Sequence, residues 1–288
     1  MNPPFKKLTV LGAGTMGQGI AHVCAAAGMK TVLYDVDISI VEQGLEGIRA
    51  NLDKGVALGK VTEDDRETTQ SLIMGSSDLS VAIKGVPLVI EAAPESIELK
   101  RKLFHMVEQR VGADTILATN TSSLSIAQIS EGMEFPARFL GIHFFNPVHI
   151  MDLVEIVWCD STAKSTREMA LEFARFIGKD PIVVKDSPGF ASSRLGVVLG
   201  LEAIRMVEAK VAEPEAIDKA MTLGYRHPMG PLRLTDLIGL DIRLGVAEYL
   251  QEKLNSQAFQ PPELLKRMVA EGKLGKKSGQ GFYRWEDE

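Results

Sequence analysis

Cysteine is scarce in this chain of 288 residues, which also lacks a net positive charge and long apolar runs. Its two cysteines, Cys24 and Cys159, are too few for a disulfide framework and suit a reducing compartment. The formal net charge is −6, which argues against general binding to nucleic acids. No segment approaches the roughly 20 uncharged apolar residues that a membrane-spanning helix needs. The best candidate, residues 195–201, is flanked by Arg194 and Glu202.

The chain reaches its first predicted strand at Leu8, which leaves no room for a signal or transit peptide. We therefore expect a cytoplasmic protein without a membrane or nucleic-acid partner, and we expect no metal site. The length allows two domains of about 150 residues each. Hydrophobic residues make up 45% of the chain, which is enough to build their cores.

Short apolar runs alternate with helical patterns up to about residue 186. Most of these runs are apolar at consecutive positions, which is typical of strands buried on both faces of a parallel sheet. The alternation predicts a doubly wound, mostly parallel α/β sheet, whose far edge can be antiparallel because the last strands follow one another closely. The predicted strands are 8–11, 31–34, 88–92, 116–119, 140–144, 153–157 and 182–184.

The character of the sequence changes at Pro188-Gly189, after which no clear strand is found before the extreme C-terminus. We therefore predict a first domain over 1–187 and a smaller all-α domain over 188–288. The first helix of the second domain is apolar on most faces, so part of its burial is expected to come from a second subunit. The predicted helices are 40–58, 97–111, one from the capping box at Ser165 to Gly178, 190–211, 214–224, 232–254 with a break near Gly239, and one from Pro261.

A Gly-x-Gly-x-x-Gly sequence lies between the first predicted strand and the first predicted helix. The pattern is short, and its strand–turn–helix setting makes it specific. Gly12 permits a tight turn, Gly14 lets a pyrophosphate approach the backbone, and Gly17 lets the helix and the strand pack closely. With Thr15 and Met16, these glycines predict the phosphate-binding loop of a Rossmann-type domain. The alternative is an ordinary strand–turn–helix.

Asp35 follows the second predicted strand, 18 residues after Gly17. This is close to the spacing expected for an acid that binds the ribose of a dinucleotide. A carboxylate accepts a hydrogen bond from the ribose 2′-hydroxyl and repels a 2′-phosphate, so Asp35 predicts NAD in preference to NADP.

His143 ends a predicted strand, and the chain then turns at Asn146-Pro147 and runs back through Glu155. Catalytic groups gather at the carboxyl ends of strands in open α/β sheets. A return strand that brings Glu155 beside His143 makes the imidazole a good general base, because the carboxylate stabilises the imidazolium. Oxidation of an alcohol by NAD needs such a base. The alternative is a structural histidine.

The sequence Asn120-Thr-Ser122-Ser123 follows another predicted strand, so its hydroxyl groups should face the same cleft. Ser122 is suited to hold the reacting oxygen of a substrate. The alternative is that these residues cap a helix beginning near Ile126.

These motifs, together, resemble those of the 3-hydroxyacyl-CoA dehydrogenase family, particularly the short bacterial 3-hydroxybutyryl-CoA dehydrogenases. The resemblance covers essentially the whole chain. The segments that carry it are 12–17, Asn120-Thr-Ser-Ser-Leu124, His143-Phe-Phe-Asn-Pro147, Leu153-Val-Glu155, Lys185-Asp-Ser-Pro-Gly-Phe190, Pro228-Met-Gly-Pro231 and Gly275-Lys-Lys-Ser-Gly-Gln-Gly-Phe-Tyr283.

The resemblance implies that His143 and Glu155 are the catalytic pair, that Ser122 binds the 3-oxygen of the substrate, and that Asp35 holds the adenosine ribose. It also implies that five further residues lie near the cofactor: Glu95, Lys100, Asn120, Asn146 and Lys277. Of these, Asn146 is also close to the reacting centre. The coenzyme A tail is expected over the helix from Ile40, where its phosphates could meet Arg49, Lys54 and Lys60. Exposed lysines and arginines are otherwise simply solvated.

One position departs from the family pattern. The residue before Arg194 is usually an asparagine that contributes to the substrate site, whereas this chain has Ser193. A hydroxyl can still form a hydrogen bond, but it is shorter than the amide and lacks its paired donors.

We therefore predict an NAD-dependent 3-hydroxyacyl-CoA dehydrogenase that interconverts (3S)-3-hydroxyacyl-CoA and 3-oxoacyl-CoA of short chain length, as a homodimer. The nearest alternative is a related dehydrogenase of a free hydroxy acid or sugar acid. A second is a non-catalytic crystallin-like or nucleotide-sensing protein that retains the fold.

Overall fold

The computed structural model describes residues 4–285 and divides the chain into two compact units, Met1–Ser187 and Pro188–Glu288. The first three residues, part of the segment in which we expect no signal peptide, lie outside the described residues. Among the described residues, no helix is long and apolar enough to cross a membrane.

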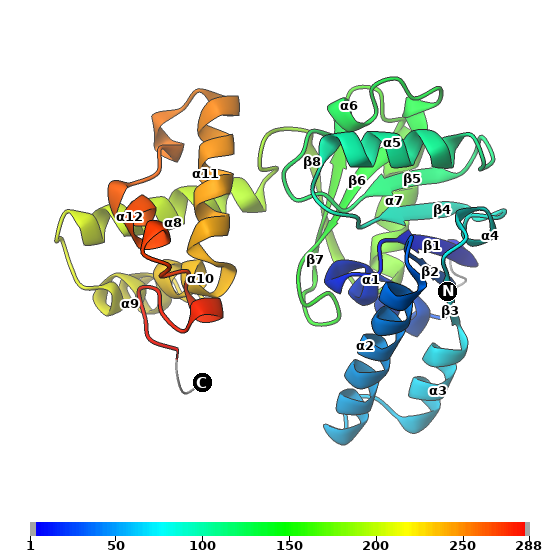
Figure 1. Cartoon of the computed structure of the whole chain (residues 1–288), viewed down its shortest axis with the longest axis horizontal. Helices are drawn as coiled ribbons and strands as arrows, with labels where there is room; N and C mark the ends of the chain where they lie inside the picture. Colours follow the sequence, from blue (N-terminus) through cyan, green and yellow to red (C-terminus); the bar gives the residue numbers. More distant parts are fainter. Residues whose placement is uncertain (1–3, 286–288) are drawn as a thin grey trace. The chain divides into compact units, whose positions relative to one another are not determined.

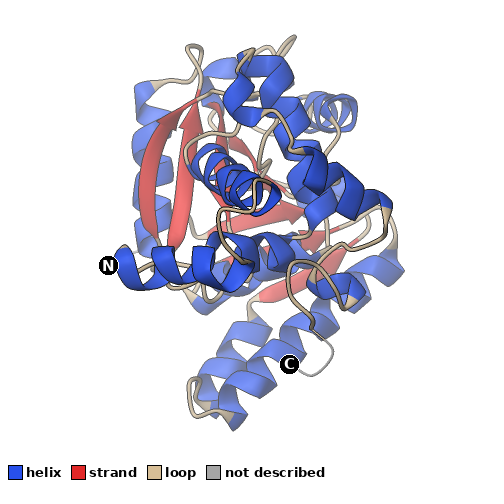
Figure 2. Cartoon of the chain, turned by 90° about the vertical axis from the view of Figure 1, so that its left-hand side faces the viewer, coloured by secondary structure: helices blue, strands red, loops and turns tan. Residues whose placement is uncertain are grey.

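The first unit contains one eight-stranded sheet with the order β3-β2-β1-β4-β5-β6-β7-β8 (Figures 1 and 2). Neighbouring strands are parallel except β6 and β7, which pair antiparallel, so the last two strands run opposite to the rest. The predicted doubly wound, mostly parallel fold is confirmed. The strands are β1 (Lys7–Leu11), β2 (Lys30–Tyr34), β3 (Ile73–Ser76), β4 (Leu88–Glu91), β5 (Ile116–Thr119), β6 (Phe139–Phe144), β7 (Leu153–Trp158) and β8 (Asp180–Lys185).

Helices α1 (Thr15–Ala26), α2 (Ile38–Ala57) and α7 (Lys164–Phe176) share one apolar core with the sheet. The right-handed crossovers that join parallel strands place α5 (Ile97–Glu108) and α6 (Ile126–Ile129) on the opposite face. There Phe104 of α5 packs edge-on against Phe139 of β6, with ring centroids 4.7 Å apart. The remaining elements are α3 (Glu63–Ser71), α4 (Leu79–Ala82) and the 3₁₀ turn Pro136–Arg138.

Two local features differ from the sequence predictions. Strand β3 was not predicted, because it is an edge strand of only four residues, of which two are apolar, and its Gly75 packs under Val41 of α2. Helix α7 begins at Lys164 without a side-chain cap, so the predicted capping box at Ser165 is wrong. The hydroxyl of Thr166 instead donates to the carbonyl of Ala137, which ties the start of the helix to the segment before β6.

The second unit is helical, with isolated β-bridges near its C-terminus. Its elements are α8 (Ser192–Glu208), α9 (Pro214–Gly224), α10 (Pro231–Ile238), α11 (Leu240–Leu254), α12 (Glu263–Ala270) and the 3₁₀ turns Gln257–Phe259 and Lys276–Ser278. The predicted break falls at Gly239, whose φ of 109° separates α10 from α11. Leu201 and Leu250 lie in its core.

Gly281 of the C-terminal motif packs against the fully buried Asp236. Its carboxylate accepts hydrogen bonds from the backbone of Phe282 and Tyr283 and from the indole of Trp285. A Cβ on Gly281 would lie 2.2 Å from this carboxylate, so a larger residue would displace the segment that Asp236 holds.

Candidate active site

The glycine-rich loop joins β1 to α1 at the carboxyl edge of the sheet. A Cβ on Gly17 would lie 1.7 Å from the carbonyl oxygen of Gly12, and a Cβ on Gly12 would lie 2.6 Å from that of Ala92. Gly12 and Gly17 are therefore required by the packing of the loop itself. A Cβ on Gly14 would meet no atom within 4 Å, so the protein leaves open space beside this residue, where α1 begins at Thr15.

Asp35 directly follows β2 and is fixed against this loop. Its Oδ2 accepts a hydrogen bond of 2.9 Å from the amide of Ala13, and its Oδ1 accepts one of 2.8 Å from the amide of Val36. These bonds hold an anionic oxygen acceptor beside the glycine loop, which fits the ribose of a dinucleotide.

His143 and Glu155 form a buried pair across β6 and β7. The antiparallel register places the two residues directly opposite each other, and Nδ1 of His143 lies 2.8 Å from Oε2 of Glu155. Glu155 is fully buried and His143 is 6% exposed. The predicted proximity of the two side chains is therefore present in the structure, and the pairing fixes the ring so that Nδ1 faces the carboxylate.

A cavity of about 340 Å³ brings the other polar residues of the sequence prediction together around His143. Its lining comes from the glycine loop, from the segments after β4 and β5, and from the segment after β6: Met16, Ala92, Ala93, Glu95, Lys100, Asn120, Ser122, His143, Phe144, Phe145 and Asn146. Within it, Oδ1 of Asn120 accepts a hydrogen bond of 2.9 Å from the amide of Phe144 and so joins two neighbouring strand ends.

Ser122 is not a helix cap. The residue that caps α6 is Ser125, whose hydroxyl accepts a hydrogen bond from the amide of Gln128. The amide and hydroxyl of Ser122 instead lie 3.1 and 3.5 Å from Oε1 of Glu95. The alternative that this serine only starts a helix is therefore wrong.

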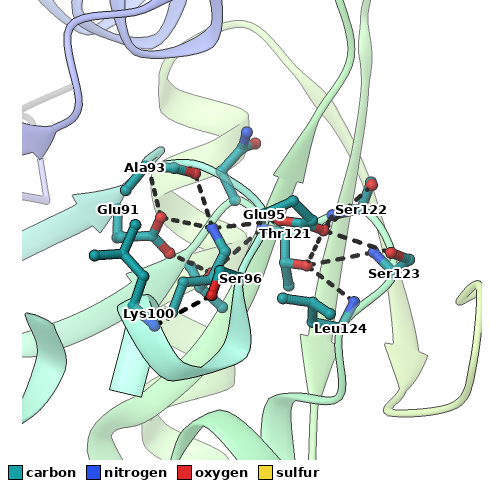
Figure 3. Close-up of polar contacts among 12 residues, drawn as sticks. Glu91, Ala93, Glu95, Ser96, Lys100, Thr121, Ser122, Ser123 and Leu124 are labelled. Carbon is teal, nitrogen blue, oxygen red and sulfur yellow. Dashed lines mark hydrogen bonds and ion pairs between the residues drawn. The ribbon is translucent and has the colours of Figure 1, made fainter. Parts of the chain in front are cut away.

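A network of charged groups links Glu95 to the interior (Figure 3). Nζ of Lys100 lies 2.6 Å from Oε1 of Glu91 and 3.4 Å from Oε2 of Glu95. Glu91, which the sequence analysis did not single out, is fully buried at the end of β4. Burial raises the pKa of its carboxyl, and the charge of Lys100 opposes this rise. The only sequence signal for Glu91 is an acidic residue at the end of an otherwise apolar run.

A larger cavity of about 930 Å³ lies between α1, α2 and the segment after Pro147. Lys54 and Lys60 both line it, as the prediction for a coenzyme A tail requires, whereas Arg49 is not part of the lining and pairs with Glu46. The lining also includes three basic residues that the sequence analysis missed, among apolar side chains: His22, His149 and Lys179. No local sequence pattern marks them, because they come from three separate elements.

Two predicted site residues belong to the second unit. Ser193 lies in the first turn of α8. Lys277 lies in a 3₁₀ turn, and its Nζ is 2.6 Å from the carboxylate of Asp241.

Known families and structures match the chain over nearly its whole length. Residues 7–187 match the NAD-binding domain of 3-hydroxyacyl-CoA dehydrogenase, and residues 189–285 match the C-terminal domain of the same family. The chain is 42% identical over 279 residues to a probable 3-hydroxybutyryl-CoA dehydrogenase of Deinococcus radiodurans, covering 97% of this chain and 100% of the relative.

Solved structures show the same similarity. The crystal structure of (S)-3-hydroxybutyryl-CoA dehydrogenase from Ralstonia eutropha is 38% identical, with a TM-score of 0.94 over 98% of this chain and 100% of the other. That of FadB2 from Mycobacterium tuberculosis is 40% identical, with a TM-score of 0.93 over 97% and 99%. These findings confirm the predicted family and the predicted NAD cofactor. The chain belongs to the 3-hydroxyacyl-CoA dehydrogenase family and is an NAD-dependent oxidoreductase.

Proposed function

We propose that the chain interconverts a short-chain (3S)-3-hydroxyacyl-CoA and the corresponding 3-oxoacyl-CoA, with His143 and Glu155 as the general acid–base pair. The observation that carries the proposal is the buried contact of 2.8 Å between these side chains, behind a cavity that His143 lines together with Ser122 and Met16 of the glycine loop. The relatives from Deinococcus radiodurans and Ralstonia eutropha, both named for 3-hydroxybutyryl-CoA, support the short acyl chain.

The proton chemistry follows from the orientation of His143. Since Nδ1 faces Glu155, Nε2 is the nitrogen that takes the proton of the 3-hydroxyl group during oxidation and returns it during reduction. The carboxylate of Glu155 stabilises the imidazolium that forms, and burial strengthens this interaction. Ser122 would hold the substrate's 3-oxygen, while Asn146 lines the same cavity.

During oxidation, NAD would accept the hydride that leaves C3 of the substrate. The residues present fit this cofactor, because Gly14 opens onto empty space at the start of α1 and Asp35 presents its carboxylate beside the loop. Thr15 begins the helix whose amide groups would receive the pyrophosphate. From the resemblance to the family, we also assign Glu95, Asn120 and Lys277 to the cofactor site.

The larger cavity is the proposed site of the coenzyme A tail. It combines apolar walls with the ammonium groups of Lys54 and Lys60, as an adenine nucleotide with phosphate groups requires. His149 lines the same cavity and stacks on His22, with ring centroids 5.6 Å apart. We further assign Ser193 to the substrate site, with a shorter reach than the asparagine usual in the family.

We also propose that the chain is a cytoplasmic homodimer assembled through its C-terminal helices. Leu195 of α8 is 67% exposed and Ile242 of α11 is 50% exposed, although both are large apolar side chains. Their burial against a second copy would contribute about 25 cal/mol per Å² of apolar surface.

The test is a steady-state comparison of NADH oxidation with 3-oxoacyl-CoA substrates of about four to sixteen carbons and with the corresponding free 3-oxo acids. We expect turnover of acetoacetyl-CoA, loss of activity as the chain lengthens, and little turnover of free acetoacetate. Turnover of the free acids alone would indicate a related dehydrogenase of free hydroxy acids. NADH binding without turnover of any substrate would indicate a non-catalytic protein.

A further inference from the structure

The larger cavity has a basic wall, although the whole chain carries a net charge of −6. Five basic residues line it: His22, Lys54, Lys60, His149 and Lys179. Among the described residues of the lining, only Asp152 is acidic. An excess of positive groups along one cavity attracts an anionic ligand, such as the phosphate groups of coenzyme A.

Two lysines of this wall have no counter-charge from the protein. Within residues 4–285, neither Lys54 nor Lys60 forms an ion pair, whereas Arg49 of α2 pairs with Glu46 at 3.1 Å. Both ammonium groups are therefore available to phosphate oxygens. A ligand that they hold would bring negative charge into the space that His149 also lines.

Lys179 fixes the segment that carries His149. Its Nζ donates to the carbonyl of Val148 at 2.6 Å and to that of Met151 at 2.8 Å, on either side of His149 in the sequence. Burial lowers the pKa of Lys179, and the charge of Asp152 opposes this change. The same contacts bring the positive charge of Lys179 close to the histidine.

Helix α1 contributes no charge on its side of the cavity. His22 lies against His149, with ring centroids 5.6 Å apart and ring planes inclined by 30°. His22 is 7% exposed, its Nδ1 has no hydrogen-bond partner among the described residues, and burial lowers its pKa to about 4. Cys24 of the same helix stays a neutral thiol, because burial raises its pKa. Both groups are therefore uncharged at neutral pH.

His149 is the group of this wall whose charge can respond to a ligand near neutral pH. Partial burial, and then repulsion by Lys179 and Lys54, lowers the pKa of its imidazole from 6.5. The free protein therefore keeps this ring mostly neutral at pH 7. A phosphate bound to the lysines reverses the repulsion, because a nearby anion favours the charged imidazole and accepts a charge-assisted hydrogen bond from it.

We propose that this cavity binds the phosphate groups of coenzyme A together with a proton, which His149 takes up. The proposal rests on the proposed function, which places the coenzyme A tail here. Because the pKa of His149 is then higher in the complex than in the free protein, affinity for the acyl-CoA rises as the pH falls between the two pKa values. The phosphate alone predicts the opposite trend, since a phosphate monoester loses negative charge below a pKa of about 6.

The experiment measures the binding of acetyl-CoA by isothermal titration calorimetry at about pH 6 and pH 8, in buffers that differ in ionisation enthalpy so that proton uptake is counted. We expect the unaltered protein to take up a fraction of a proton and to bind about fivefold more tightly at the lower pH. His149→Gln should lose both effects. His105→Gln is the matched control, because His105 lies on α5 outside the lining of both cavities, and it should behave as the unaltered protein.

The second readout uses acetoacetyl-pantetheine, a thioester without a nucleotide or a phosphate group. At the lower pH, His149→Gln should raise KM for acetoacetyl-CoA about fivefold and leave KM for acetoacetyl-pantetheine unchanged. Equal proton uptake by His149→Gln and the unaltered protein would overturn the proposal. An equal rise in KM for both thioesters would also overturn it, because His149 would then act at the reacting group. If the unaltered protein neither binds acetyl-CoA nor turns over acetoacetyl-CoA, the proposed function fails instead.

Discussion

Replacement of Glu155 by Gln tests the acid–base pair with the least change in shape. Gln has the same size as Glu and keeps one side-chain oxygen as a hydrogen-bond acceptor, so it fills the same fully buried position opposite His143. What it removes is the negative charge 2.8 Å from Nδ1. The imidazolium that forms during oxidation of the substrate then lacks its counter-charge.

The magnitude follows from the geometry. At 2.8 Å and an effective dielectric constant of about 20, the Coulomb attraction between the two charges is about 6 kcal/mol, which is an upper bound. A charged hydrogen bond contributes about 1.5–3 kcal/mol and a neutral one about 0.5–1.5 kcal/mol, so the replacement removes about 1–1.5 kcal/mol. Because about 1.4 kcal/mol corresponds to a tenfold change in rate, kcat should fall roughly 5- to 13-fold.

The assay is kcat in both directions, with NADH binding measured beside it. The NADH dissociation constant should stay within threefold of its original value, because Glu155 lies outside the cofactor site. Glu168→Gln is the matched control, because Glu168 is an exposed carboxylate of α7 that pairs with Lys164 at 3.5 Å. An unchanged rate in both directions in Glu155→Gln would refute the assignment of the pair.

Three further predictions concern other parts of the chain. Asp35→Ser should narrow the preference for NAD over NADP, measured as the ratio of kcat/KM values, because the carboxylate that repels a 2′-phosphate is gone; comparable values for both cofactors in the unaltered protein would contradict this assignment. Burial, and to a smaller extent repulsion by His149, lowers the pKa of His22 from 6.5 to about 4. As the pH falls from 6.5 to 4, His22 therefore binds a proton in the unfolded chain before it does so in the folded protein. The free energy of unfolding should therefore fall by up to about 3 kcal/mol more in the unaltered protein than in His22→Gln between pH 6.5 and pH 4. Urea unfolding at both pH values measures this fall, and an equal fall in the two proteins would disprove the prediction. Finally, light scattering at micromolar concentration should give a dimer that Leu195→Asp weakens, whereas a monomeric unaltered protein would exclude the proposed interface.

The sequence alone determined those features that depend on local spacing. The glycine pattern at 12–17 requires close backbone contacts, and a Cβ on Gly17 would indeed lie 1.7 Å from Gly12. The pairing of His143 with Glu155 could be predicted because strand, turn and return strand are consecutive in the chain, so the register is set over a short distance. The mostly parallel sheet followed from the alternation of buried strands and helices.

Only the tertiary structure decided which distant residues meet. Lys100, which the family resemblance places near the cofactor, is buried beside the end of β4, where its ammonium group lies 2.6 Å from the carboxylate of Glu91. His22 and His149, which are 127 positions apart, stack only because α1 and the segment after Pro147 line one cavity. Strand β3 likewise has only two apolar residues of its own, Ile73 and Met74, and is defined by its pairing with β2. Contacts of this kind depend on packing over long separations, which local patterns of hydrophobicity and charge do not encode.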